Sequence, residues 1–228
     1  MIVSLDNLEN GIQWWQTYVD KWGLDFANAE YYDIYKLRAD GITQKWWSAT
    51  VDHLWDWKAI RAPKPPNTKQ EILDRGIKRF DAIGGLFSRL RSISSSEPSI
   101  ADVTWEEIGP LFDLCFQIKP GGSRYGSPVF ASKMCHFIFP KVFPVIDNLA
   151  TGIFEYEFYW RGMKDEWFRF QEKSEALGML KAAMKTNGKE VHDRFPFQTK
   201  IIELSHIGYA KHKAKYIKDN IVNVENER

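Results

Sequence analysis

The residues best suited to chemistry lie in one stretch, residues 119–150, which combines a glycine-rich turn with a carboxylate. Gly121, Gly122 and Gly126 give the turn a backbone that can adopt positive φ and approach another molecule closely. Asp147 stands near the end of the stretch, where the next helix should begin. A carboxylate in that place can stabilise positive charge on a reacting sugar and can orient a water molecule.

The elements that must position these groups follow from the residues between them. Ser127 followed by Pro128 is typical of a helix start, with a capping hydroxyl and a proline at the first helical position. The helix should end before Pro140, because proline lacks an N–H and disfavours helical backbone in the residue ahead of it. Residues 143–146 are apolar and include a proline, which predicts a buried, extended connector that delivers Asp147 to the next helix.

The glycine-rich turn is suited to an anion, because its main-chain amides can point together at one ligand. Arg124 and Lys119 add positive charge beside it. We therefore predict contact with a phosphate group, while an ordinary loop with solvated charges is the alternative. The residues assigned to this contact are Gly121, Gly122, Ser123, Arg124, Tyr125, Gly126 and Ser127.

The order of glycine hairpin, helix, short apolar segment ending in Pro-Val-Ile-Asp, and helix resembles the helix-hairpin-helix DNA glycosylases. The family pattern is Pro-Gly-x-Gly, an alanine-containing helix and Val-Asp; this chain has Pro120-Gly121-Gly122, Ala131 and Ile146-Asp147. The resemblance implies an all-α, two-lobed fold in which hairpin amides hold a DNA phosphate. It also implies that Asp147 assists cleavage of the N-glycosidic bond. It is confined to residues 119–150.

This chain departs from the family pattern in two places. Additional residues separate Pro120 from Ala131, which changes the register of the hairpin. Asn148 and Leu149 stand where the family often has a small or β-branched residue and then a histidine. These departures favour an enzyme for a modified or bulky base over a standard repair enzyme.

A nucleophilic lysine is the feature that separates bifunctional members of the family from monofunctional ones. Its place falls near Pro128 and Val129, and neither is a lysine. Lys133 lies one turn later, on the same helical face as Val129, so it is the candidate substitute. We expect a monofunctional enzyme, with Lys133 as a surface or phosphate-contacting residue.

The aspartate and the aromatic residues each have a simpler interpretation. Asp147 could serve only as a helix cap, and the sequence leaves capping and catalysis both open. Trp46 and Trp47 could form a wedge or stack on an extruded base, and His136 could face a cleft. Because the chain has ten tryptophans, core packing is the alternative for these residues.

The rest of the chain predicts an all-α protein, folded as one helical domain over residues 1–228 or as two lobes. Apolar residues recur at helical spacing, and no segment shows the sustained alternation typical of strands. Capping patterns begin helices at Thr43, Thr68 and Thr104.

Two further segments carry specific expectations. Apolar residues from Ile72 to Leu90 predict one helix, in which Gly84 and Gly85 form a kink or a point of close helix approach. The C-terminal extension, residues 211–228, is rich in lysine and could make a second contact with the DNA backbone, although a solvated tail explains it as well.

Composition limits the partners. A net charge of +1 means that a polyanion must be met by a local basic patch. Cys115 and Cys135 show no metal-binding spacing, so we expect no metal or other cofactor, and their small number is typical of a reducing cytoplasm. No membrane span and no signal peptide are visible in the sequence, and no obligate protein partner is implied.

These features predict a DNA glycosylase that releases a modified base, without a cofactor. Within the family, archaeal-type members remove oxidised guanine, whereas some bacterial relatives excise modified phage bases such as glucosylated hydroxymethylcytosine in defence. The alternative is a non-catalytic α-helical module that binds nucleic acid or another protein.

Overall fold

The computed structural model describes residues 1–22, 33, 37–39, 41–57, 59–60, 65–93, 97–120, 127–146, 152–153, 155–186, 188 and 195–226, with the backbone alone for 18–22 and 215–226. These residues form helices and their connections, with no strand among them, which confirms the predicted all-α class. The helices are α1 (Leu5–Trp22), α3 (Gln44–Asp56), α4 (Lys69–Ile77), α5 (Phe80–Arg91), α6 (Trp105–Phe116), α7 (Pro128–Ile138), α9 (Tyr156–Arg169), α10 (Lys173–Thr186) and α11 (Phe197–Asn226).

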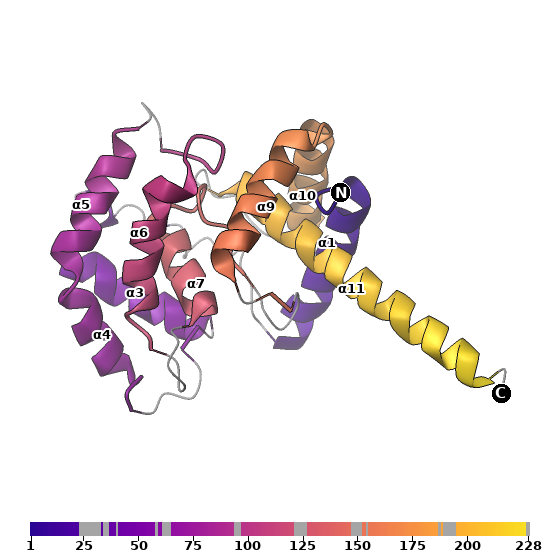
Figure 1. Cartoon of the computed structure of the whole chain (residues 1–228), viewed down its shortest axis with the longest axis horizontal. Coiled ribbons are helices and arrows are strands. Elements are labelled where there is room, and N and C mark those ends of the chain that lie inside the picture. Colours follow the sequence, from indigo (N-terminus) through magenta and orange to yellow (C-terminus); the bar gives the residue numbers. More distant parts are fainter. Residues whose placement is uncertain are drawn as a thin grey trace.

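The helices gather in two groups (Figure 1). Helices α3 to α7 lie together on one side, and α9, α10 and α11 lie on the other with α1, which comes from the opposite end of the chain. The buried apolar side chains of both groups nevertheless belong to one connected cluster. A single hydrophobic core therefore joins the two groups.

Local capping signals set several of the helix starts, as predicted. The side chain of Thr43 accepts a hydrogen bond from the amide of Trp46 at the start of α3. At the start of α4, Thr68 and Glu71 exchange hydrogen bonds in a capping box. Such exchanges satisfy amides that have no partner inside the helix.

The predicted single helix from Ile72 to Leu90 is wrong. The chain forms α4 and α5 instead, and the break falls at Lys78–Arg79, where Lys78 N bonds to Asp74 O and Arg79 N closes a tighter turn on Gly76 O. Gly84 and Gly85 lie inside α5 with open space where a Cβ would stand. The predicted close helix approach therefore does not occur at these two glycines.

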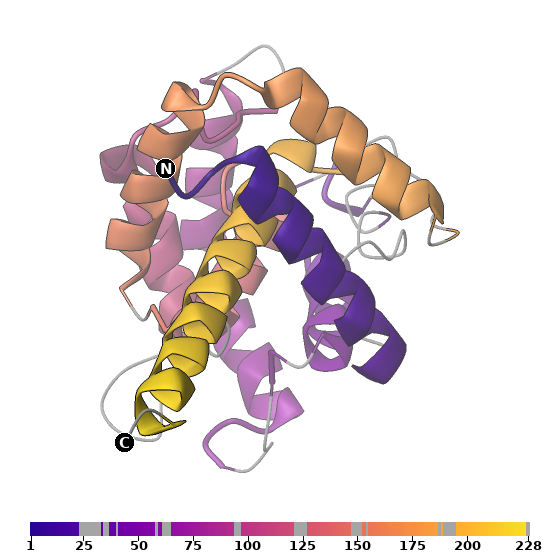
Figure 2. The same cartoon turned by 90° about the vertical axis from the view of Figure 1, so that its right-hand side faces the viewer.

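The close helix approach occurs elsewhere, at the crossing of α1 and α11, which Figure 2 shows near the centre of the molecule. A Cβ on Gly11 would stand 1.9 Å from Leu204 O, and a Cβ on Gly208 would stand 1.9 Å from Asn7 O. Only residues without a side chain allow two backbones to come this near. The first and last helices are thereby held together.

Helix α11 changes character along its length. Residues 199–206 are all buried, which makes this part the central element of its group. The C-terminal end of the helix projects away from the rest of the molecule and ends at Asn226 (Figure 1). Most of the predicted lysine-rich extension, residues 211–226, is thus a continuation of a core helix.

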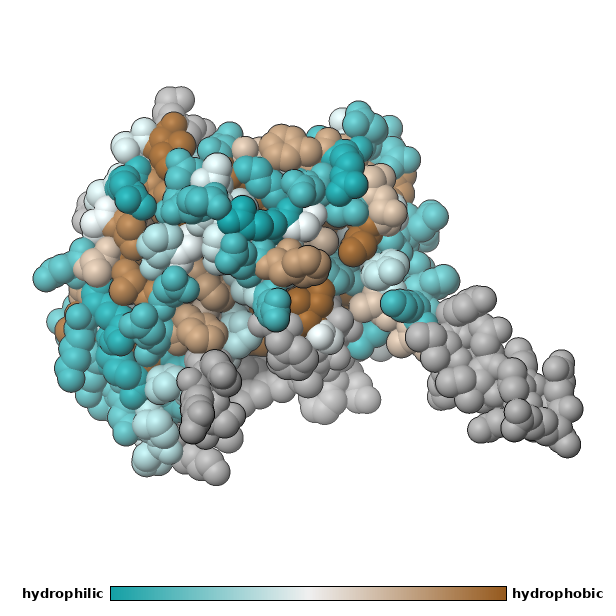
Figure 3. All heavy atoms as spheres, viewed as in Figure 1, coloured by the Kyte–Doolittle hydropathy of each residue, from teal (hydrophilic) through white to brown (hydrophobic). Residues whose placement is uncertain are grey.

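The surface is mixed in character. On the face shown in Figure 3, hydrophilic residues predominate and hydrophobic residues form separate patches between them. Within the described part of the chain, no helix combines the length and the apolar character needed to cross a membrane.

Candidate functional site

The central residues of the predicted site, Gly121–Gly126 and Asp147–Ala150, lie outside the described residues. The structure does describe both flanks. Ser127 caps α7 as predicted, because its hydroxyl accepts a hydrogen bond from Phe130 N at 3.2 Å. The amide of Ser127 donates to Lys119 O at 3.3 Å, so the two ends of the glycine-rich segment are tied together.

The α6 end of that segment is also held by side chains. Asn67 donates from its amide to Pro120 O at 2.8 Å, and the guanidinium of Arg75 bonds to Ile118 O and to Asn67. The glycine-rich segment therefore begins and ends on fixed backbone, between two helices, α6 and α7, that pack against each other.

Two lysines from this region are bound to the end of α3. Lys119 donates to Ala59 O at 3.0 Å, and Lys133 donates to Trp57 O at 2.7 Å. Cations are favourable at a helix C-terminus, where the last carbonyls carry partial negative charge. Both ammonium groups thus fix α3 against the segment that contains the candidate site.

The connector before Asp147, residues 142–146, has its carbonyl groups bound by side chains from two helices, α7 and α9. Four consecutive carbonyls accept hydrogen bonds, from Trp160 Nε1 to Val142 O (2.9 Å), His136 Nδ1 to Phe143 O (2.8 Å), Tyr156 OH to Pro144 O (2.6 Å) and Tyr159 OH to Val145 O (3.4 Å). All four donors are buried.

The amides of the same connector are bound as well. Val145 N donates to a carboxylate oxygen of Glu203, and Ile146 N donates to the hydroxyl of Ser132 at 3.3 Å. Buried backbone outside helices and strands needs hydrogen-bond partners, so each of these bonds replaces one that water would otherwise make. The chain therefore reaches Asp147 from a backbone fixed by α7, α9 and α11.

Five residues beside the connector form what we call the Trp57 cluster: Trp57, Lys133, His136, Lys200 and Glu203. The ammonium groups of Lys133 and Lys200 lie 4.7 and 5.1 Å from the centroid of the Trp57 ring. Lys200 Nζ is 2.7 Å from Glu203 Oε2, and His136 packs its ring against Trp57. The cluster combines cation–π contacts with a buried ion pair.

Burial dominates the electrostatics of this cluster. It lowers the pKa of Lys200, an effect that Glu203 opposes, and it raises the pKa of Glu203, which Lys200 opposes. The pKa of His136 lies well below its ordinary value, first because the ring is buried and second because Lys200 is near. His136 is therefore neutral at physiological pH, and it carries its proton on Nδ1, which faces Phe143 O.

Trp46, Trp47 and His136 do not form a base pocket or wedge. Both tryptophans are completely buried, and Trp47 donates to Leu73 O and fills the space beside Gly76. His136 is 1% exposed and holds the connector. The predicted stacking role needs accessible ring faces, which these residues lack, so the core-packing interpretation describes them.

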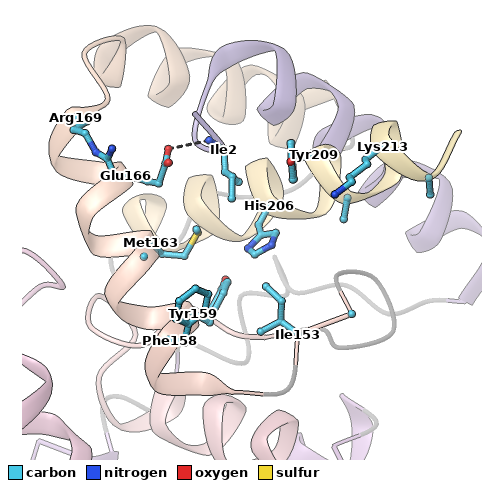
Figure 4. A pocket seen from close by; sticks show the side chains of 14 residues that line it. Ile2, Ile153, Phe158, Tyr159, Met163, Glu166, Arg169, His206, Tyr209 and Lys213 are labelled. Carbon is cyan, nitrogen blue, oxygen red and sulfur yellow. Dashed lines mark hydrogen bonds between the residues drawn. The ribbon is translucent and has the colours of Figure 1, made fainter. Parts of the chain in front are cut away.

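A cavity of about 590 Å³ lies between α9 and α11, next to the connector; we call it the α9–α11 cavity. Figure 4 shows His206 of α11 pointing toward Tyr159 of α9 and toward Ile153. Its lining residues are Ile2, Gly152, Ile153, Phe158, Tyr159, Gly162, Met163, Glu166, Arg169, His206, Tyr209, Ala210, Lys213 and Ala214.

Sequence reasoning found Lys133 and His136 but missed their partners Trp57, Lys200 and Glu203. The missed signal is a lysine and a glutamate three residues apart within the apolar run of α11. A lysine and a glutamate at this spacing are common on exposed helix faces. Only the buried residues on both sides of this pair distinguish it from an exposed one.

The described residues contain no group of three or more side chains that could hold a metal ion. Comparison of the whole chain with models of protein families, with curated proteins and with solved structures gave no match.

Proposed function

We propose that this protein is a monofunctional DNA glycosylase that releases a modified base, with Asp147 as the carboxylate that assists cleavage of the N-glycosidic bond. The observation that carries the proposal is the connector. Six side-chain hydrogen bonds fix the five-residue connector immediately ahead of Asp147.

Such rigidity suits the proposed chemistry. Departure of the base leaves positive charge on the sugar, and a carboxylate stabilises that charge only if it is held close to it. A group placed on fixed backbone loses little freedom when the substrate binds, which lowers the barrier. A residue needed only as a helix cap would not require this support from three other helices.

The phosphate contact is supported by the geometry at the base of the glycine-rich segment. Its ends are joined by the bond between Ser127 N and Lys119 O, and its last residue leads directly into the N-terminus of α7. A helix N-terminus favours an anion because the helix dipole is positive there.

A monofunctional mechanism is supported by the contacts of Lys133. A nucleophilic amine must be neutral so that its lone pair can attack the sugar. Lys133 instead donates to Trp57 O and lies against the face of the Trp57 ring. Both contacts stabilise the charged ammonium form.

The test is base release from a panel of DNAs that carry oxidised, deaminated, alkylated or glucosylated bases, scored as free base and as abasic sites. Asp147→Asn should abolish release while DNA affinity remains. Asp81→Asn, which changes an exposed aspartate on α5, is the matched control and should release base as the wild type does.

Three results would contradict the proposal. Absence of release from every DNA that the wild type binds would leave a non-catalytic DNA-binding module. Absence of salt-dependent DNA binding would leave a protein-interaction module. Undiminished release by Asp147→Asn would remove the assigned role of the carboxylate.

A further inference from the structure

The α9–α11 cavity has features of a binding site that the proposed catalytic role of Asp147 does not require. Its volume of about 590 Å³ falls within the range of about 300–1,000 Å³ that is usual for small-molecule sites. We propose that it binds a planar, uncharged heteroaromatic ring that carries a negatively charged group, the chemistry of a mononucleotide. The ring can come from a free nucleotide or from a nucleotide extruded from DNA.

The first argument is the character of the walls. Ile153 and Met163 offer apolar surface, and the rings of Tyr159 and His206 pack in a tilted arrangement with their centroids 5.2 Å apart. Phe158 is 74% exposed at the edge of the cavity, so its ring offers apolar area that a bound molecule can bury. Flat apolar and aromatic surfaces favour a planar ring.

The second argument is His206. It is 4% exposed, and its Nδ1 has no hydrogen-bond partner among the described residues. Burial lowers its pKa from 6.5 to about 4, so the ring is neutral at physiological pH. A buried polar group without a partner is costly, and a neutral imidazole can offer both a donor and an acceptor. A ligand with polar atoms on the ring edge would satisfy it, whereas an aliphatic ligand would not.

The third argument is the charge at the rim. Arg169 and Lys213 line the cavity and are exposed, which suits a phosphate at its entrance. Glu166 is the described acidic residue of the lining, and one of its oxygens already accepts hydrogen bonds from the amides of Ile2 and Val3. The positive side chains therefore outnumber the negative one, and the negative one is partly occupied.

The cavity is also coupled to the connector. Tyr159 forms part of its wall and donates through its hydroxyl to Val145 O. A ligand in the cavity would therefore contact the same ring that supports the backbone two residues before Asp147.

The test blocks the cavity without disturbing the fold. Gly162 lies on α9 in the cavity wall, and a Cβ there would meet no atom within 4 Å. Gly162→Leu should therefore fold normally and place its side chain in the ligand's space. Gly178→Leu on α10 is the matched control, because that glycine is equally open and does not line the cavity.

Binding is measured by calorimetry with the common ribo- and deoxyribonucleoside monophosphates and with the corresponding nucleosides. We expect the wild type and Gly178→Leu to bind a nucleotide, and Gly162→Leu to bind it at least about tenfold more weakly. Arg169→Gln should weaken nucleotide binding about two- to fivefold and leave nucleoside binding unchanged, because only the nucleotide carries the phosphate.

A second arm separates the two sources of the ring. Duplexes that contain 2-aminopurine report extrusion of a base through an increase in fluorescence. If free nucleotides do not bind, but DNA gives an increase that Gly162→Leu abolishes and Gly178→Leu keeps, the ring comes from DNA. Nucleotide or DNA signals that Gly162→Leu leaves unchanged would overturn the proposal, as would the absence of both signals.

This outcome is independent of the proposed glycosylase activity. A protein that binds nucleotides in the cavity but releases no base would contradict the glycosylase proposal alone.

Discussion

The ion pair between Lys200 and Glu203 offers the sharpest test of how the connector is held. Lys200 is completely buried, and its ammonium lies 2.7 Å from a carboxylate oxygen of Glu203. Glu203→Gln keeps an oxygen that can accept from Val145 N, but it removes the negative charge and turns an NH₂ group toward the ammonium. Removing one partner of a buried pair costs about 3–5 kcal/mol, because the remaining charge is left without compensation.

The pH dependence of that cost can be derived from Lys200. In the variant the pKa of Lys200 should fall further below its value in the unfolded chain, since burial remains and the opposing effect of Glu203 is lost. Between these two pKa values the unfolded state binds more protons than the native state, so stability rises with pH. The deficit of Glu203→Gln relative to the wild type should therefore be largest at neutral pH and shrink in alkaline solution.

The assay is reversible urea unfolding followed by tryptophan fluorescence at several pH values. Glu172→Gln, an exposed glutamate beside α10, is the matched control and should change stability by less than about 0.5 kcal/mol. Lys200→Met combined with Glu203→Gln should recover most of the loss, because no buried charge remains. A single variant within about 1 kcal/mol of the wild type, or a double variant no more stable than the single one, would refute the reasoning.

Three further predictions follow from contacts described above. Gly11→Ala should destabilise the protein by about 3 kcal/mol, since the new Cβ would overlap Leu204 O. Gly84→Ala should stabilise it by about 0.5–1 kcal/mol, because the new Cβ meets open space within a helix. Urea unfolding of both variants checks these values. Burial lowers the pKa of His206 from 6.5 to about 4, so between these pH values the unfolded chain binds a proton at this ring and the native protein does not. On account of this group, the free energy of unfolding should therefore fall by about 1.4 kcal/mol per pH unit from pH 6.5 toward pH 4. In His206→Gln that slope should be shallower by one proton, and an unchanged slope would contradict the assignment. Tyr156→Phe leaves Pro144 O unpaired in the core, so it should lower the free energy of unfolding by about 1–3 kcal/mol and slow base release. Tyr159→Phe should have a smaller effect on both, because its bond to Val145 O is longer at 3.4 Å. Equal effects of the two variants would show that these bonds do not fix the connector.

The predictions that the structure confirms are those that depend on neighbouring residues. Ser127, Pro128 and Pro140 placed α7 correctly, because a capping hydroxyl and proline act on the backbone within a few residues. The same holds for Thr43 and Thr68 at the starts of α3 and α4.

What the sequence could not predict depends on contacts between distant residues. No residue near Lys78 predicts that α4 ends there. The packing of Gly76 against Trp47 holds α4 to α3, whereas α5 contacts α6, so the two helices are directed by different neighbours. The Trp57 cluster joins residues of α7 and α11 with the end of α3, so its members are unremarkable until the fold brings them together. The roles of Asp147 and the glycine-rich segment remain predictions.

The backbone contact between α1 and α11 determines the order in which the chain can complete its fold during synthesis. Leu8, Ile12 and Trp15 of α1 are buried, but Gly208, against which the helix packs, is synthesised after helices α3 to α10. Helix α1 therefore reaches its final place only after α11 has been made, and its apolar face stays uncovered meanwhile. Nascent chains stopped after α10 should be substrates for chaperones or proteases, and a ribosome arrested a few dozen codons later should hold a protein that resists both.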